Sequence, residues 1–127
     1  AHIIARSEYW VAFLDIYPRR PGHTLVVPIE EVSHLGELSA ESRRHLLDGV
    51  IEVQHILSKR FETDDFLVGI HDGSIAGQEV PHVHIHVIPR TLDDGGLTLL
   101  SCWPHSPAPG GTPDFEELRK MADSLEY

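Results

Sequence analysis

Polar and apolar residues alternate with a period of two over residues 82–87, within a strand predicted at residues 82–88, where histidines are separated by aliphatic residues. This period is the signature of a β-strand with two different faces. We therefore expect the aliphatic side chains to face a core and the histidines to share the opposite face, with neighbours roughly 6.6–6.8 Å apart. Pro81 and Pro89 bracket the run and predict its two ends. The alternating residues are His82, Val83, His84, Ile85, His86 and Val87.

Four other segments have the composition of β-strands. Tyr9, Trp10 and Val11 are strong β-formers, and residues 25–27 form an aliphatic run that is typical of a buried strand. Two prolines and a glycine in residues 17–22 predict a loop. The first three segments therefore predict an antiparallel meander. The predicted strands are residues 2–5, 9–16, 23–29 and 65–71.

The pattern changes to a helical period over residues 39–61. Ser39 is a suitable N-cap, and Glu41 lies in the first turn, where an acidic side chain favours the helix dipole. A second helix is predicted over residues 113–126, after an irregular arm, residues 91–113, that holds four glycines and four prolines. The expected apolar stripe of the long helix is Leu46, Leu47, Val50, Ile51, Val53, Leu57 and Phe61, and that of the short helix is Phe115, Leu118, Met121 or Ala122, and Leu125.

The order of these elements predicts an α+β fold. We expect an antiparallel sheet of about five strands that carries the long helix, with a C-terminal helix in addition. A length of 127 residues predicts a single domain over residues 1–127.

Composition excludes several classes of partner. Ten Lys and Arg against twenty Asp and Glu give a net charge of −10, which argues against binding nucleic acid. No run of about eighteen apolar residues occurs, so no membrane partner is expected. Cys102 is the single cysteine, which indicates no oxidising compartment and favours a cytoplasmic location.

Three histidines in register indicate chemistry, because imidazole is a poor β-former beside Val, Ile or Thr. Two readings follow from the residues alone. One is a metal site, since imidazole is the commonest metal ligand. The other is nucleophilic catalysis by one imidazole whose neighbours position groups around it. The P-loop and the nucleophile-elbow serine sequence are both absent, which excludes those two enzyme classes.

The heptapeptide His-Val-His-Ile-His-Val-Ile resembles the histidine triad (HIT) family of nucleotide hydrolases and transferases. The resemblance implies an antiparallel sheet with one long helix, usually paired as a two-fold homodimer. It also implies a small-molecule nucleotide substrate, attacked at its α-phosphorus to release a nucleoside monophosphate. Matching segments outside the heptapeptide are Asp72-Gly73, Ala76-Gly77-Gln78 and Val80, and a separate block at residues 12–16 and 21–28.

The same resemblance implies roles for individual residues. His84 corresponds to the nucleophile that forms a covalent nucleotidyl-histidine, and the carbonyl of His82 would hold its other ring nitrogen. His86 would stabilise charge on the phosphate or the leaving group, and His23 would complete the cluster. The resemblance implies no cofactor, although a divalent cation can accompany a polyphosphate substrate. Substrate contacts are expected from Gln78 and the 77–80 loop to phosphate, from Asp15 to ribose, and from Phe13 and Ile16 to the base.

Two positions depart from the family pattern. His71 stands where relatives carry Asn or Gln, and Glu79 stands where many carry Ser or Thr; both face the phosphates in relatives. Relatives split dinucleoside polyphosphates or phosphoramidates, and the Val-Ile-Pro-Arg sequence of residues 87–90 resembles the former branch and its bacterial cousins. The Cys-x-x-Cys pair of some bacterial relatives is absent, so no structural zinc is expected.

Two further hypotheses stay open beside the hydrolase. A metalloprotein would use His82, His84 and His86 with His23 or His71, although the downstream glutamate of cupin-type sites is missing. A nucleotide-binding adaptor would hold the same ligand with little turnover, through Glu79 for example.

Overall fold

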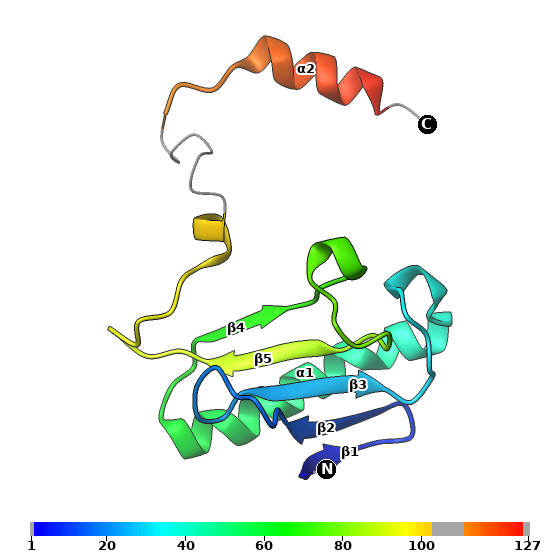
Figure 1. Cartoon of the computed structure of the whole chain (residues 1–127), viewed down its shortest axis with the longest axis vertical. Helices are drawn as coiled ribbons and strands as arrows, with labels where there is room; N and C mark the ends of the chain where they lie inside the picture. The colour runs from blue at the N-terminus through cyan, green and yellow to red at the C-terminus, as the bar shows by residue number, and fades with distance from the viewer. Residues whose placement is uncertain (1, 103–110, 126–127) are drawn as a thin grey trace. The chain divides into compact units, whose positions relative to one another are not determined.

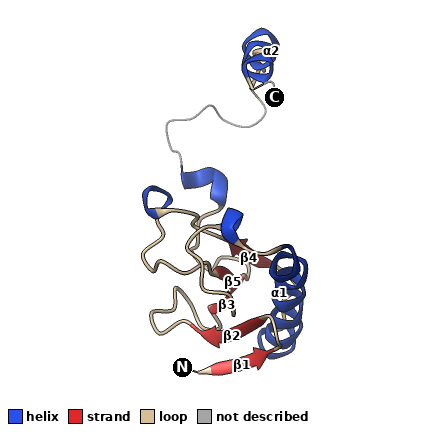
Figure 2. Ribbon diagram, turned by 90° about the vertical axis from the view of Figure 1, so that its right-hand side faces the viewer, coloured by secondary structure: helices blue, strands red, loops and turns tan. Residues whose placement is uncertain are grey.

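A five-stranded antiparallel sheet in the order β1-β2-β3-β5-β4 is the main feature of the computed structural model, which describes residues 2–102 and 111–125 (Figure 1). The long helix α1 (Ala40–Phe61) lies against one face of this sheet, as Figure 2 shows. The chain divides into two compact units, Ala1–Gly96 and Leu97–Tyr127. The other elements are β1 (Ile3–Arg6), β2 (Trp10–Leu14), β3 (Thr24–Pro28), β4 (Phe66–Gly69), β5 (Ile85–Pro89), α2 (Phe115–Ser124), and the 3-10 helices η1 (Leu35–Glu37), η2 (Ser74–Ala76) and η3 (Leu99–Cys102).

Strand pairing brings segments that are far apart in sequence side by side. β3 pairs with β5, and Leu25 lies opposite His86. Phe13 of β2 lies opposite Leu25, and Gly69 of β4 lies opposite His86. Because directly opposite residues of an antiparallel sheet point to the same face, this row places Phe13 and His86 on one face.

The other face of the sheet packs against α1. Ser39 caps the helix by accepting a hydrogen bond from the backbone N–H of Ser42 at 3.1 Å. The helix ends before Glu62, whose left-handed backbone (φ 53°) reverses the chain direction. The core consists of Leu46, Val50, Val53 and Leu57 from α1, with Trp10, Ala12, Val26, Ile85 and Val87 from the strands, among other residues.

The alternation over residues 82–87 is confirmed for burial, but the strand predicted over residues 82–88 is not regular from its start. Val83, Ile85 and Val87 are 2%, 3% and 0% exposed. The regular strand begins only at Ile85, however, so His82 and His84 precede it. The physical reason is pairing, because Ile85 is the first residue of this segment that lies opposite a residue of β3.

The predicted strands and helices are otherwise confirmed, with altered bounds. The strand predicted to reach Ile16 stops at Leu14, because the Asp15 carboxylate accepts the backbone N–H of Tyr17 and turns the chain. Two members of the predicted apolar stripe were wrong, since Leu47 and Ile51 are 63% and 52% exposed. Each follows a buried residue by about 100° around the helix, which carries it beyond the face that the sheet covers.

The C-terminal unit contains α2. Its N-cap is Asp114, which accepts the backbone N–H of Glu117 at 3.1 Å. The predicted apolar stripe of this helix is exposed: Phe115 is 74% and Leu118 is 59% accessible. Of the predicted irregular arm, residues 103–110 lie outside the described residues, and η3 occupies part of the remainder. Among the described helices, none has the length and apolar character that crossing a membrane requires.

Candidate active site

Two histidines and an aspartate meet on the sheet face opposite α1. β5 turns Ile85 and Val87 into the core, so His86 between them faces the other way. His23 comes just before β3, and its Nε2 lies 2.8 Å from Nδ1 of His86. The Asp15 carboxylate, just after β2, lies 3.5 Å from the same Nε2. The pairing of β3 with its neighbours therefore assembles this cluster.

His84 is held by the backbone two residues before it. Its Nδ1 lies 2.7 Å from the carbonyl oxygen of His82. A carbonyl only accepts hydrogen bonds, so Nδ1 carries the proton and Nε2 keeps an unshared electron pair. The ring lies edge-on to His86, with centroids 5.1 Å apart. An unprotonated ring nitrogen beside a second imidazole is suited to nucleophilic attack.

The ring of His82 serves a different contact. Its Nε2 donates a hydrogen bond to the carbonyl oxygen of Pro28 at 3.0 Å. This bond ties the segment before β5 to the end of β3. The carbonyl of His82 thus contacts His84 in the cluster, whereas the ring of His82 binds the backbone of Pro28.

A chain of hydrogen bonds fixes the protons of His23 and His86. The backbone N–H of Arg19 donates to Nδ1 of His23 at 3.1 Å. Nδ1 of His23 is therefore an acceptor, and the proton of the neutral ring is on Nε2. That Nε2–H donates to Nδ1 of His86, which leaves His86 with its own proton on Nε2. Nε2 of His84 then carries a free electron pair, and Nε2 of His86 carries a proton that it can donate.

The imidazole rings of His23 and His86 both have lowered pKa values, and both are neutral at pH 7. Burial, with repulsion from His23, His84 and His71, lowers the pKa of His86 from 6.5 to about 4, against the opposing effect of Asp15. Burial also lowers the pKa of His23, with a smaller contribution from Arg19, and Asp15 again opposes the shift. His23 is 3% exposed, which accounts for the dominance of burial.

The residues predicted to hold the nucleoside lie on β2 and directly after it. Phe13 shares the face of His86 through the row of paired residues. Asp15 follows at the strand end, with Oδ1 on the backbone N–H of Tyr17 and Oδ2 toward His23. Ile16 is 71% exposed, so its side chain is accessible to a ligand. The contact between Asp15 and His23 adds an electrostatic role that strand composition alone did not indicate.

The residues predicted to contact phosphate come from the segment between β4 and β5. The ring of His71 lies 5.4 Å from that of His86, centroid to centroid. Gln78 instead braces its own loop, because its Oε1 accepts the N–H of Gly73 at 2.8 Å and its Nε2 donates to the carbonyl of Ser33 at 3.0 Å. Glu79 is exposed on the same loop.

Asp15, His23 and His86 also form the one group of metal-type ligands found among the described residues, with ligand atoms within 4.8 Å of one another. This set differs from the predicted one of alternating histidines. Its hydrogen bonds disfavour a metal, because coordination through Nε2 of neutral His23 would move the proton to Nδ1, where the Arg19 N–H already points. The donor set therefore fits a hydrogen-bonded relay better than a cation.

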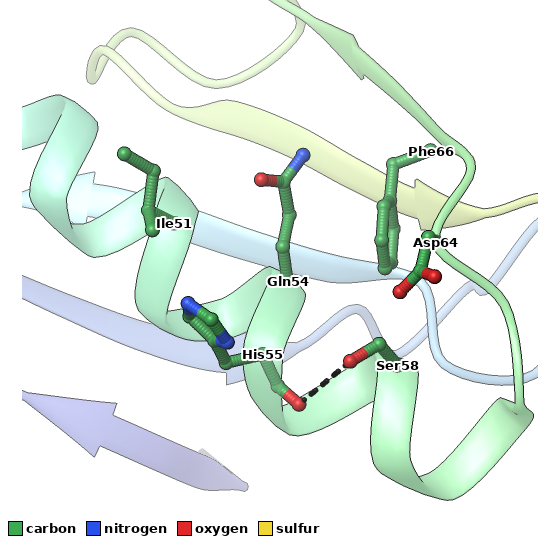
Figure 3. A pocket seen from close by; sticks show the side chains of 6 residues that line it. All are labelled: Ile51, Gln54, His55, Ser58, Asp64 and Phe66. Atoms are coloured by element: carbon green, nitrogen blue, oxygen red, sulfur yellow. Dashed lines mark hydrogen bonds between the residues drawn. The ribbon is translucent and has the colours of Figure 1, made fainter.

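A separate cleft lies on the α1 side, between the helix and the segment that leads into β4 (Figure 3). Its lining includes Ile51, His55 and Phe66. Because His86 faces away from α1, this cleft is distinct from the histidine cluster.

Comparison with known proteins decides the family. A HIT domain is recognised over residues 1–92. The chain belongs to the HIT family. The histidine cluster lies entirely within the matched HIT residues, as do β1 to β5 and α1.

HIT proteins similar to this chain include named hydrolases. An asymmetrical bis(5'-nucleosyl)-tetraphosphatase from Schizosaccharomyces pombe is 38% identical over 94 residues, which cover 74% of this chain and 52% of the relative. This chain thus spans about half of that protein's length. An adenosine 5'-monophosphoramidase from the same organism is 38% identical over 122 residues, covering 96% of this chain and 84% of the relative. The crystal structure of a HIT family protein from Bacillus anthracis aligns with a TM-score of 0.78 at 27% identity, covering 98% of this chain and 84% of that one.

Proposed function

We propose that this chain is a nucleotidyl hydrolase or transferase in which Nε2 of His84 attacks the α-phosphorus of a nucleoside phosphate conjugate. The observation that carries this proposal is the 2.7 Å contact between Nδ1 of His84 and the His82 carbonyl, which leaves Nε2 as the free electron pair. The names of the relatives support a nucleotide substrate.

The proposed reaction has two displacements. In the first, a bond forms between Nε2 of His84 and the α-phosphorus, while the bond to the leaving group breaks and the leaving group keeps its electron pair. The His84 ring becomes a cation, which the His82 carbonyl stabilises through the Nδ1–H. In the second, water attacks the α-phosphorus, the phosphorus–nitrogen bond breaks, and the water proton passes to solvent. The product is a nucleoside monophosphate, and His84 recovers its neutral form.

The state of His86 favours one kind of leaving group. A neutral His86 offers Nε2–H as a hydrogen-bond donor but has no surplus proton to give away at pH 7. A phosphate leaves readily as an anion and needs only a donor to stabilise its oxygen, whereas an amine needs a proton. We therefore propose a dinucleoside polyphosphate as the preferred class, with a phosphoramidate as the second candidate because of the monophosphoramidase relative.

Substrate binding is proposed along β2 and the segment before β5. Asp15 would accept the ribose hydroxyls, and Phe13 and Ile16 would contact the base. His71 lies where a donor would reach the phosphates beside His86, while Gln78 would shape the loop that carries the exposed Glu79. We propose no resident cofactor; a divalent cation would arrive with a polyphosphate, held by the oxygens of the substrate.

We also propose a homodimer joined at β4. This strand has a strand neighbour on one side within the described sheet, so its other edge presents backbone groups for pairing. Apolar side chains lie exposed nearby, with Val68 at 41% and Ile51 at 52%, and the cleft of Figure 3 lies along the same region. A second copy would bury this surface. We propose a cytoplasmic location, consistent with the single cysteine.

Trapping of the covalent intermediate tests the proposed function. The protein is mixed with a dinucleoside tetraphosphate or an adenosine phosphoramidate, quenched within one turnover, and examined by peptide mass spectrometry. We expect a nucleotidyl group on His84 in the wild type and none in His84→Ala. Hydrolysis without any adduct would contradict the covalent step, and binding without hydrolysis would favour the adaptor hypothesis.

A further inference from the structure

A cluster of charged residues joins the loop between β2 and β3 to the turn after β5. Its centre is the carboxylate of Asp94, whose side chain is 7% exposed. Arg90 binds it through two nitrogens, with Nε–Oδ2 and Nη2–Oδ1 distances of 2.8 and 2.9 Å. The backbone N–H groups of Thr91 and Gly96 also donate to it. These bonds shape the turn, and the side-chain bond to Arg90 is the largest cause that holds the pKa of Asp94 well below its usual range.

Arg20 connects the loop to this carboxylate. Its Nη1 lies 2.6 Å from Oδ2 of Asp94 and 3.2 Å from the hydroxyl of Thr91. Its Nε is buried and has no hydrogen-bond partner among the described residues. Leaving a buried donor unpaired costs free energy, so the contact with Asp94, rather than the surroundings of Nε, determines where this side chain lies.

The backbone beside Arg20 reaches the active site. Its carbonyl oxygen accepts the N–H of His23 at 3.1 Å. The preceding N–H, that of Arg19, donates to Nδ1 of His23 at 3.1 Å. This second bond favours the proton of His23 on Nε2, as does the Asp15 carboxylate 3.5 Å from that nitrogen. The loop that Asp94 holds through Arg20 therefore contributes, through the Arg19 amide, to the tautomer of His23.

We propose that Asp94 is a positioning residue: by holding Arg20 it keeps the Arg19 amide on His23, and it thereby fixes the protons of His23 and His86. The inference rests on the proposed function, in which His86 presents Nε2–H to the phosphate. We call the contact between Asp94 and Arg20 the clamp. Without the clamp, His23 can carry its proton on Nδ1 instead. Its Nε2 then accepts from His86, whose proton moves to Nδ1, and the donor toward the substrate is lost.

The protonation of His86 depends on the hydrogen bond with His23 and on the other titratable groups around it. The titratable groups that face it are His23 beside β3, Asp15 after β2, His84 on the segment before β5, and His71 after β4. Two of these, His23 and Asp15, flank the loop that the clamp holds. Releasing the loop should therefore change both the tautomer of His23 and the pH at which His86 titrates.

Three variants separate the clamp from general stability. Asp94→Asn removes the charge at the centre of the cluster, and Arg20→Gln breaks the link to the loop while leaving the contacts of Asp94 with Arg90, Thr91 and Gly96. Asp93→Asn is the matched control, because it makes the same charge change one residue away, at a left-handed position (φ 56°) that Asn tolerates. The tautomer is read from long-range proton–nitrogen NMR correlations of the imidazoles in substrate-free protein, and thermal unfolding reports on the fold.

We expect the wild type and Asp93→Asn to show His23 with its proton on Nε2. Asp94→Asn and Arg20→Gln should show mixed His23 tautomers, a shifted pH profile of kcat, and a loss of kcat on the order of 10- to 100-fold. The two variants combined should lose little more than either alone, because they break one connection. Unchanged tautomers and pH profiles in both variants would overturn the proposal, even if kcat or stability fell. The NMR measurement needs no substrate, so an ordered His23 in a wild type that hydrolyses nothing would refute the proposed function and leave the clamp in place.

Discussion

Nδ1 of His84 lies 2.7 Å from the carbonyl oxygen of His82, two residues earlier in the chain. A ring nitrogen that donates to a carbonyl cannot also attack, so this contact leaves Nε2 as the nitrogen that acts in the proposed reaction. The proposed role of His84 as the nucleophile thus depends on one backbone atom as much as on the imidazole itself.

The first prediction concerns that nucleophile. Replacing His84 with Ala should lower kcat by roughly 10⁴-fold or more, as the loss of a nucleophile typically does. Nucleotide binding should persist, because the proposed base and ribose contacts come from Phe13, Asp15 and Ile16. Steady-state hydrolysis and equilibrium nucleotide binding measure the two effects. His2→Ala, which removes an exposed imidazole outside the cluster, serves as the control, and near-normal turnover in His84→Ala would end the covalent interpretation.

The second prediction concerns stability and pH. The folded-state pKa of His86 is about 4, below its usual 6.5, so between these values the unfolded chain binds a proton that the folded chain does not. Stability should therefore fall as pH decreases from about 6.5 to about 4. His23, whose pKa is also lowered, contributes in the same direction. Urea unfolding across this range should show a weaker pH dependence in His86→Gln than in the wild type, and equal slopes would contradict the assignment.

The third prediction concerns His71, whose ring centroid lies 5.4 Å from that of His86. An imidazole can change charge between about pH 5 and 8, and a bound polyphosphate favours the charged form of a neighbouring ring. A positively charged His71 would bind the phosphates more strongly than a neutral one. The value of kcat/KM should therefore fall with rising pH through a step that His71→Gln lacks. A pH–rate series on both proteins with one substrate is the measurement. Superimposable profiles would leave His71 as a neutral hydrogen-bond donor.

The fourth prediction concerns a close approach between α1 and β2. A Cβ added at Gly49 would lie 2.7 Å from the side chain of Trp10, which is 3% exposed. Alanine improves helix propensity by up to about 1 kcal/mol, but the clash in a packed core costs about 1–3 kcal/mol. Gly49→Ala should therefore unfold at lower temperature. Gly36→Ala, which meets no atom within 4 Å, should stay within about 0.5 kcal/mol of wild type. A more stable Gly49→Ala would show that the helix can shift away.

The fifth prediction concerns assembly. Light scattering at micromolar concentration should give the mass of a dimer, and Val68→Lys on β4 should give a monomer, because a buried lysine opposes strand pairing. Ile3→Lys on β1, the other edge strand of the described sheet, is the matched control and should stay dimeric. A monomeric wild type would contradict the homodimer proposal.

Much of the fold follows from local patterns. The cap at Ser39, the stripe from Leu46 to Leu57 and the alternation around Val83 and Ile85 each depend on residues within a few turns of one another, and each is present in the structure. Leu47 and Ile51 were wrongly predicted to be buried. The helical period shows which residues share a stripe, but it does not show how wide a part of the helix the sheet covers. The start of β5 was misplaced because pairing with β3, and not composition, decides where a regular strand begins.

The sequence by itself determined which residues could carry chemistry: residue type and spacing single out the three alternating histidines, and the resemblance to the HIT family adds His23 and Asp15. For His84, the resemblance already implied the contact with the His82 carbonyl, which the structure contains. Only the tertiary structure decided which ring nitrogen carries the proton in His23, His82 and His86. That decision depends on the Arg19 amide and the Pro28 carbonyl, and on Asp94, which reaches the loop through Arg20. Every residue but proline has the same backbone N–H, and every residue has the carbonyl, so no side-chain pattern marks these atoms. Their roles arise when the pairing of β3 with β5 brings distant segments within hydrogen-bond distance.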